Sequence, residues 1–243
     1  QGQRQVNRGL GCVLVALLLG CGGQDEVSTR SGVPSDGGSS MMDAPSSDTT
    51  VATDELVIPE DAPTVVFLGD SIGAGLHLAE HQAFPAVLQR MLFRDDLPFH
   101  LINASESGRT SSGGVTAMPW VLRSKPDVVV IELGGNDGLR GIQLEDTEAN
   151  LRAMIEMARA ADATVLLLGV QIPQNYGDYA VQFGALYPNL AQELDLAFVP
   201  EFLREVGGVP EMNLEDGLHP TAEGHEHLAR NVVSGLRSVV RAR

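Results

Sequence analysis

Short apolar runs alternate with amphipathic segments along the chain from Ala62 onward. The runs are rich in Val, Ile and Leu and are mostly continuous, which is typical of strands that are covered on both faces. They predict strands at residues 64–68, 99–102, 127–133, 164–170 and 196–199.

Helical periodicity marks segments between and after these runs. Apolar residues fall on one face of the segments 148–159 and 222–240. Strands and helices that alternate in this way predict an α/β fold, a three-layer α/β/α sandwich around a five-stranded parallel sheet. In such sheets, ligands bind beyond the carboxyl ends of the strands.

Four polar motifs lie far apart in the sequence, and three of them directly follow predicted strands. They are FLGDS at 67–71, NASESG at 103–108, LGGND at 133–137 and, near the C-terminus, DGLH at 216–219. Because the carboxyl ends of parallel strands meet at one edge of a sheet, we expect the first three motifs to lie close together.

The residue types in these motifs fit nucleophilic catalysis. A serine hydroxyl is inert at neutral pH unless a base takes its proton, and Ser71 and His219 offer that pair. Asp216 precedes His219 by three residues and can orient its ring, with Glu215 as an alternative carboxylate. Structural interpretations remain open as well: Ser71 as a helix N-cap, Asn136 as a turn residue and His219 as a surface side chain.

Taken together, the four motifs resemble those of the SGNH (GDSL) hydrolases, over roughly residues 64–240. The run ELGGNDGLRG at 132–141 is similar in particular to the bacterial branch of thioesterase I, lysophospholipases and arylesterases. The resemblance implies a flavodoxin-like SGNH hydrolase fold. It also implies a serine esterase that cleaves carboxylic esters (aryl esters, lysophospholipids, thioesters) through an acyl-serine intermediate, with no metal or cofactor.

The resemblance assigns a role to each motif. Ser71 is the expected nucleophile, His219 the general base and Asp216 the carboxylate that orients it. The backbone N–H groups of Ser71 and Gly108, with the side-chain amide of Asn136, are the expected oxyanion hole.

The same resemblance implies an acyl pocket after the fourth strand. Ile172, Pro173 and Tyr176 occupy the stretch that lines this pocket in the family. The chain departs from the branch at Arg109, where an Asp is common and a cation is expected beside the oxyanion hole. It departs again at Phe84, which replaces a Trp. Both departures bear on acyl-chain preference.

The net charge and the positions of two histidines argue against nucleic acid as a partner and against a metal site. The formal net charge of −16 disfavours nucleic acid, because phosphate binding requires clustered positive charge. His225 and His227 lie two residues apart on a predicted helix and point to different sides, so we expect no metal site there.

The N-terminal residues predict export. Arg4 and Arg8 precede an apolar stretch at 10–19 that is about half the length of a membrane-spanning helix, so residues 1–20 are expected to be a signal peptide. The stretch ends in LLGC at 18–21, which resembles a bacterial lipobox. Cys21 is therefore expected to carry lipid, and an ordinary signal with an incidental cysteine is the alternative.

The next segment predicts a tether. Residues 21–61 begin with the lipidated cysteine and are poor in large apolar groups, so they cannot offset their ordering entropy by burial. Residues 62–243 then form the SGNH hydrolase domain. We expect an exported, monomeric enzyme that is lipid-anchored to a membrane of the bacterial cell envelope.

Two alternative functions fit the same motifs. The protein can be a carbohydrate O-acetyl esterase, since the same four motifs serve acetyl removal from polysaccharides. It can also be a non-catalytic surface-binding lipoprotein that keeps the fold, although the complete set of catalytic residue types argues against that interpretation.

Overall fold

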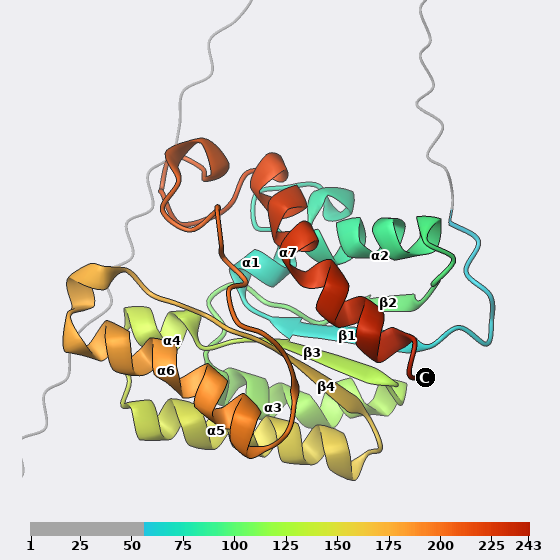
Figure 1. The fold of residues 1–243 in the computed structure, drawn as a ribbon, viewed down its shortest axis with the longest axis horizontal. Helices are drawn as coiled ribbons and strands as arrows, with labels where there is room; N and C mark the ends of the chain where they lie inside the picture. The colour runs from blue at the N-terminus through green and yellow to red at the C-terminus, as the bar shows by residue number, and fades with distance from the viewer. Residues whose placement is uncertain (1–55) are drawn as a thin grey trace, which may run out of the picture. The chain divides into compact units, whose positions relative to one another are not determined.

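The computed structural model describes residues 56–243, and this part of the chain is built on a five-stranded parallel sheet (Figure 1). The strand order is β2-β1-β3-β4-β5. Every predicted strand is present, with ends shifted by two residues or fewer. The strands are β1 (Thr64–Gly69), β2 (His100–Asn103), β3 (Val128–Glu132), β4 (Thr164–Leu168) and β5 (Ala197–Val199).

The continuous apolar pattern of the strands follows from burial on both faces of the sheet. β1 pairs with β2 on one side and with β3 on the other. Its Val66 and Leu68 enter one hydrophobic core, whereas Val65 and Phe67 enter the core on the opposite face. Because neither face meets solvent, polar residues do not alternate along these strands.

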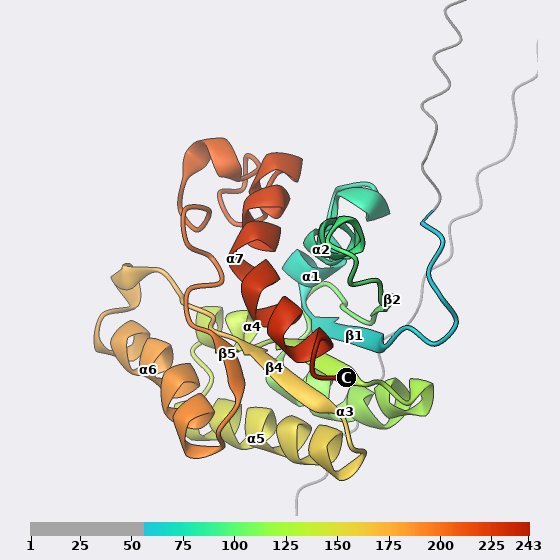
Figure 2. The ribbon, with the colours of Figure 1, turned by 45° about the vertical axis from the view of Figure 1, so that its right-hand side comes forward.

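Helices cover both faces and form the outer layers of the predicted sandwich (Figure 2). One face is covered by α3 (Ser111–Val121), α5 (Leu144–Ala160) and α6 (Asp178–Glu193). The other is covered by α2 (Phe84–Arg94) and α7 (Ala222–Val240), which pack against each other. The fold is the predicted three-layer α/β/α sandwich.

Two of these helices show why the sequence pattern understates the helical content. Proline lies inside α3 at Pro119 and inside α6 at Pro188. α3 also contains Gly113 and Gly114 near its start. Such residues are poor helix formers, so local propensity is weak where packing against the sheet stabilises the helix.

The polar motifs follow the strands at the expected sheet edge. The short helix α1 (Ser71–Ala74) begins directly after β1, and α4 (Gly135–Leu139) follows β3. A long connection at 200–221 joins β5 to α7, and an antiparallel bridge between Asn213 and Pro220 closes its last part. Within residues 56–243, no helix combines the length and apolar character needed to cross a membrane.

The expectations for the N-terminal region lie mostly outside the described residues. These are the signal peptide at 1–20, lipidation of Cys21 and the tether up to residue 55. They remain predictions.

Candidate active site

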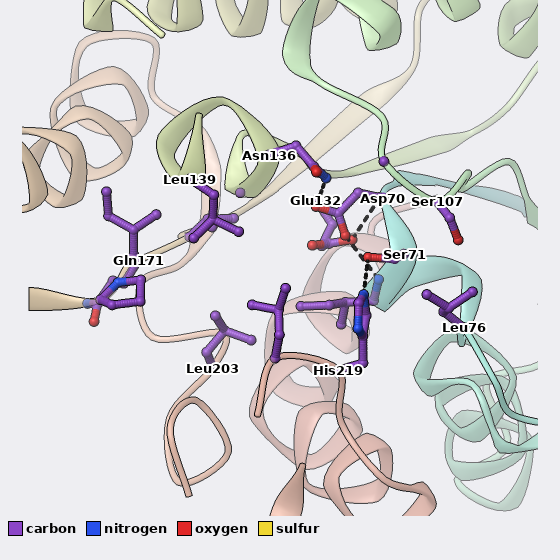
Figure 3. Close-up of a pocket in the computed structure, with 17 residues that line it drawn as sticks. Asp70, Ser71, Leu76, Ser107, Glu132, Asn136, Leu139, Gln171, Leu203 and His219 are labelled. Carbon is purple, nitrogen blue, oxygen red and sulfur yellow. Dashed lines mark hydrogen bonds between the residues drawn. The ribbon is translucent and has the colours of Figure 1, made fainter. Parts of the chain in front are cut away.

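Ser71 lies at a sharp strand-to-helix turn. It is the first residue of α1, and the preceding Asp70 is the N-cap, whose side chain accepts the N–H of Ile72 at 3.0 Å. The Ser71 side chain lines a cavity but is itself largely buried (Figure 3). The turn therefore holds the hydroxyl in one place at the carboxyl end of β1.

His219 and Asp216 reach Ser71 from the connection before α7. The Nε2 atom of His219 lies 2.9 Å from the Ser71 Oγ, and its Nδ1 lies 2.7 Å from the Asp216 Oδ2. If Nδ1 carries the proton and donates it to Asp216, the lone pair on Nε2 faces the serine hydroxyl. Figure 3 shows His219 and Ser71 side by side at one wall of the cavity.

Local hydrogen bonds fix the Asp216 carboxylate in the turn. Its Oδ1 accepts the backbone N–H groups of Leu218 and His219, each at 2.9 Å. These bonds hold the pKa of Asp216 well below its usual range, led by the His219 backbone N–H and then the His219 side chain. Asp216 is the partner of His219, and the rival Glu215 makes no hydrogen bond to that ring in the described structure.

Two backbone donors face the same cavity without an acceptor. Among residues 56–243, the N–H groups of Ser71 and Gly108 have no hydrogen-bond partner, and both residues line the cavity. Gly108 has a φ of 78° in the turn after β2, a conformation that favours glycine.

The side-chain amide of Asn136 completes this set of donors. Its Nδ2 donates to the Asp70 Oδ2 at 3.2 Å, and its Oδ1 accepts from Arg140 at 3.4 Å. The same guanidinium donates to the Gly108 carbonyl at 3.2 Å. These contacts fix the orientation of the amide and leave one Nδ2–H for a bound group.

The cavity beside Ser71 has a volume of about 250 Å³ and mostly apolar walls. Apolar side chains from four separate parts of the chain line it: Ile72, Leu76, Leu139, Val170, Ile172, Pro173, Leu203 and Leu218. A second hollow of about 430 Å³ shares Ile172, Pro173 and Leu203 with the first, so the two adjoin.

The residues expected to line an acyl pocket divide into two groups. Ile172 and Pro173 line the cavity. Tyr176 lies outside its lining, and its hydroxyl donates to the Leu139 carbonyl at 2.9 Å. The ring therefore supports the short helix that bounds the cavity.

The two departures from the family pattern also have defined places. The Arg109 guanidinium donates to the backbone carbonyls of Gly69 and Ala104. It also pairs with Glu106 at 2.6 Å, so it binds the ends of β1 and β2 and does not line the cavity. Phe84 is the first residue of α2, and its side chain is fully buried in the core on that face of the sheet.

Histidines outside the four motifs do not form a metal site in the described structure. His225 is buried, and its Nδ1 accepts the N–H of Phe84 at 3.1 Å. Within residues 56–243, no three His, Cys, Asp or Glu side chains are grouped as metal ligands.

Residues 67–227, which contain all this geometry, match the model of the GDSL-like Lipase/Acylhydrolase family. The chain belongs to this family. It is 44% identical to Esterase TesA of Pseudomonas aeruginosa, over 74% of this chain and 90% of the relative. It is 38% identical to the Thioesterase 1/protease 1/lysophospholipase L1 of Escherichia coli K12, over 74% of this chain and 86% of the relative.

Structural comparison gives the same family. A crystal structure of TesA superposes with a TM-score of 0.70 at 44% identity, covering 72% of this chain and 99% of the other. The protein is therefore a carboxylic ester hydrolase of the GDSL family with the SGNH fold.

Several residues of this GDSL hydrolase site were not identified from the sequence. Glu132 ends an apolar strand and gives no periodic signal, and Arg140 is one of several exposed arginines. Leu203 and Leu218 reach the cavity from the irregular connection before α7, where no period exists to assign a face. The run ELGGNDGLRG contains Glu132 and Arg140, and its resemblance to the family was the one available signal.

Proposed function

We propose that this GDSL hydrolase cleaves esters through an acyl-Ser71 intermediate, with His219 as general base and Asp216 as its orienting carboxylate. The observation that supports this most directly is the pair of contacts from Ser71 to His219 and from His219 to Asp216, at 2.9 Å and 2.7 Å. Both distances are suitable for proton transfer and for orientation of the ring.

The reaction follows from this arrangement in two halves. The Ser71 Oγ attacks the ester carbonyl carbon while its proton passes to the His219 Nε2. The tetrahedral oxyanion is held by the free N–H groups of Ser71 and Gly108 and by the remaining Nδ2–H of Asn136. His219 then gives its proton to the departing alcohol, and a water molecule hydrolyses the acyl-serine by the same route.

The walls of the cavity favour an apolar acyl group over a sugar. Burial of a methylene group contributes about 0.8 kcal/mol, and Leu139, Val170 and Ile172 offer a surface for such burial. Aryl esters, lysophospholipids and thioesters all present an acyl chain of this kind. The carbohydrate O-acetyl esterase is a second candidate, but no specific contact in the cavity favours it.

A panel of p-nitrophenyl esters from acetyl to palmitoyl, measured beside an acetylated xylan, tests this substrate class. We expect kcat/KM to rise from acetyl to longer chains before it falls. Preference for the acetylated sugar over every acyl ester would contradict the proposed acyl substrate and support the carbohydrate esterase.

We also propose that the enzyme is exported and monomeric, with residues 1–20 as signal peptide and residues 62–243 as the hydrolase domain. The support is the basic and apolar pattern of the first residues and the LLGC sequence at 18–21. A lipid on Cys21 and a tether at 21–61 let the enzyme act on esters at a membrane surface of the cell envelope.

A further inference from the structure

Glu132 is a buried carboxyl group directly behind the nucleophile turn, and the proposed mechanism does not use it. It is the last residue of β3, and only 2% of its surface is exposed. Its Oε2 accepts the backbone N–H of Asp70 and that of Gly73, each at 3.2 Å. These two residues flank the Ser71-Ile72 segment, so one oxygen bonds the turn on both sides of the nucleophile.

The hydrogen bonds of the turn select which N–H is free. The first N–H groups of a helix have no intrahelical partner and need other acceptors. Here Asp70 accepts the N–H of Ile72, and Glu132 accepts those of Asp70 and Gly73. Of the N–H groups of residues 70–73, only that of Ser71 has no acceptor within the described structure, and Ser71 lines the cavity.

We propose that Glu132 is a positioning residue, which holds the nucleophile turn so that the Ser71 N–H and Oγ point into the cavity together. This inference rests on the proposed role of Ser71 and assigns a function to a residue outside the proposed catalytic and oxyanion-hole residues. Glu132 lies at the wall of the cavity, but its hydrogen bonds go to the backbone of the turn, so it acts on Ser71 through the backbone.

Two glycines leave the space that the Glu132 carboxyl occupies. A Cβ atom on Gly69 would lie 2.4 Å from the Glu132 Oε2, and one on Gly73 would lie 3.0 Å from it. The Gly73 Cβ would also lie 2.4 Å from the Ser105 Oγ, a buried hydroxyl with no partner within the described chain. The glycines before and after Ser71 thus allow the carboxyl to approach the turn closely.

The surroundings of the Glu132 carboxyl favour its neutral form, which suits an acceptor of backbone hydrogen bonds and does not suit a general base. Burial raises the pKa of Glu132 well above its usual range, and the nearby Asp70 charge raises it further. Burial raises the pKa of Asp70 as well, but the hydrogen bonds that it accepts from Ile72 and Asn136 oppose this rise. The neutral Glu132 carboxyl still has a carbonyl oxygen with two lone pairs, enough for both N–H donors.

The test compares three substitutions at this position in the full-length enzyme. Glu132→Gln keeps a neutral acceptor of the same size, and we expect a kcat within about threefold of wild type, since the two N–H bonds can be retained. Glu132→Leu removes the acceptor, and we expect kcat to fall about 10²-fold with KM unchanged, the usual cost of a small misplacement. Glu132→Asp shortens the side chain and so withdraws the acceptor from the turn. This variant replaces Glu132→Leu in the comparison with Glu132→Gln if the Leu variant does not fold.

The rate of Ser71 phosphonylation by a fluorophosphonate probe separates positioning from stability. Val232→Ala, on the buried face of α7, serves as a control of comparable stability loss with unchanged kcat per folded molecule. We expect the labelling rate to fall with kcat in Glu132→Leu or Glu132→Asp and to recover in Glu132→Gln. Wild-type labelling and kcat in the Leu or Asp variant, or a Gln variant as slow as Leu, overturns the inference. Absence of labelling in the wild type instead overturns the role of Ser71.

Discussion

The Asn136 Nδ2 donates a hydrogen bond to the Asp70 Oδ2 at 3.2 Å, although Asn136 lies in α4 and Asp70 is the N-cap of α1. Asp70 directly precedes the nucleophile, and Asn136 belongs to the third motif. One carboxylate therefore links the turn that presents Ser71 to the amide that faces the developing oxyanion. The bond orients the amide before substrate arrives, which is a condition for strong stabilisation of a transition state.

We predict that Asn136→Ala lowers kcat by about 10²–10³-fold, or about 3–4 kcal/mol, because one oriented oxyanion donor is lost. KM should change little. Steady-state kinetics on a p-nitrophenyl ester provides the measurement. Asn150→Ala is the matched control, since Asn150 donates to Ser111 and does not line the cavity. Equal kcat in both variants would remove Asn136 from the oxyanion hole.

We predict that Asp216→Asn lowers kcat by about 10²–10⁴-fold, since the ring loses its orienting carboxylate but the base remains. His219→Ala should cost more. Glu215→Gln serves as the control, because Glu215 makes no hydrogen bond to His219 in the described structure. A larger loss in Glu215→Gln than in Asp216→Asn would reverse the assignment of the carboxylate.

We predict that the folded protein loses stability in mild acid because His225 becomes protonated. Burial, and then the charge of His219, lowers the pKa of His225 to about 4, whereas a histidine in the unfolded chain titrates near 6.5. The unfolded state therefore binds more protons between these values, so stability falls as pH falls from about 6.5 to 4, by about 3 kcal/mol in total. Protonation also removes the acceptor for the Phe84 N–H at the start of α2.

Denaturant unfolding at several pH values between 4 and 7 measures this dependence. In His225→Asn the side-chain oxygen can accept the same N–H without titrating. We expect this variant to be less stable than wild type at pH 7 and to lose less stability on acidification. Parallel stability curves for the two proteins would show that His225 does not carry the effect.

The sequence predicts the sheet and the site better than it predicts the helices. Strands buried on both faces give continuous apolar runs, and β1 and β3 end where polar motifs begin, so both the fold and the meeting of Ser71 with Asn136 follow from topology. α3 and α6 are obscured by Pro119 and Pro188, because tertiary packing outweighs local propensity there.

The sequence does not predict the direction in which side chains near the site point. Arg109 follows Gly108, but its guanidinium turns back to the carbonyls of Gly69 and Ala104. Tyr176 follows the lining residues closely, yet its ring bonds the Leu139 carbonyl outside the cavity. Each direction depends on which carbonyl lies within reach in three dimensions.

The proposal of a lipid anchor leads to a separate prediction about Cys21. We expect this cysteine to carry acyl chains in a bacterial host and Cys21→Ser to release soluble enzyme with unchanged kcat. The reason is the LLGC sequence that follows the apolar stretch. Mass spectrometry of the N-terminal peptide from the membrane fraction provides the measurement. An unmodified Cys21, or cleavage at another bond, would show that the protein is not a lipoprotein.

Ser71→Ala and His219→Ala should each remove nearly all hydrolysis, and the double variant should lose little more, because the two residues act as one unit. Intact-mass analysis after reaction with a fluorophosphonate probe tests the central assignment most directly. We predict one probe per wild-type molecule, attached to Ser71, with no labelling of Ser71→Ala and very slow labelling of His219→Ala. Labelling of Ser71→Ala at the wild-type rate, or of another residue in the wild type, would contradict the account.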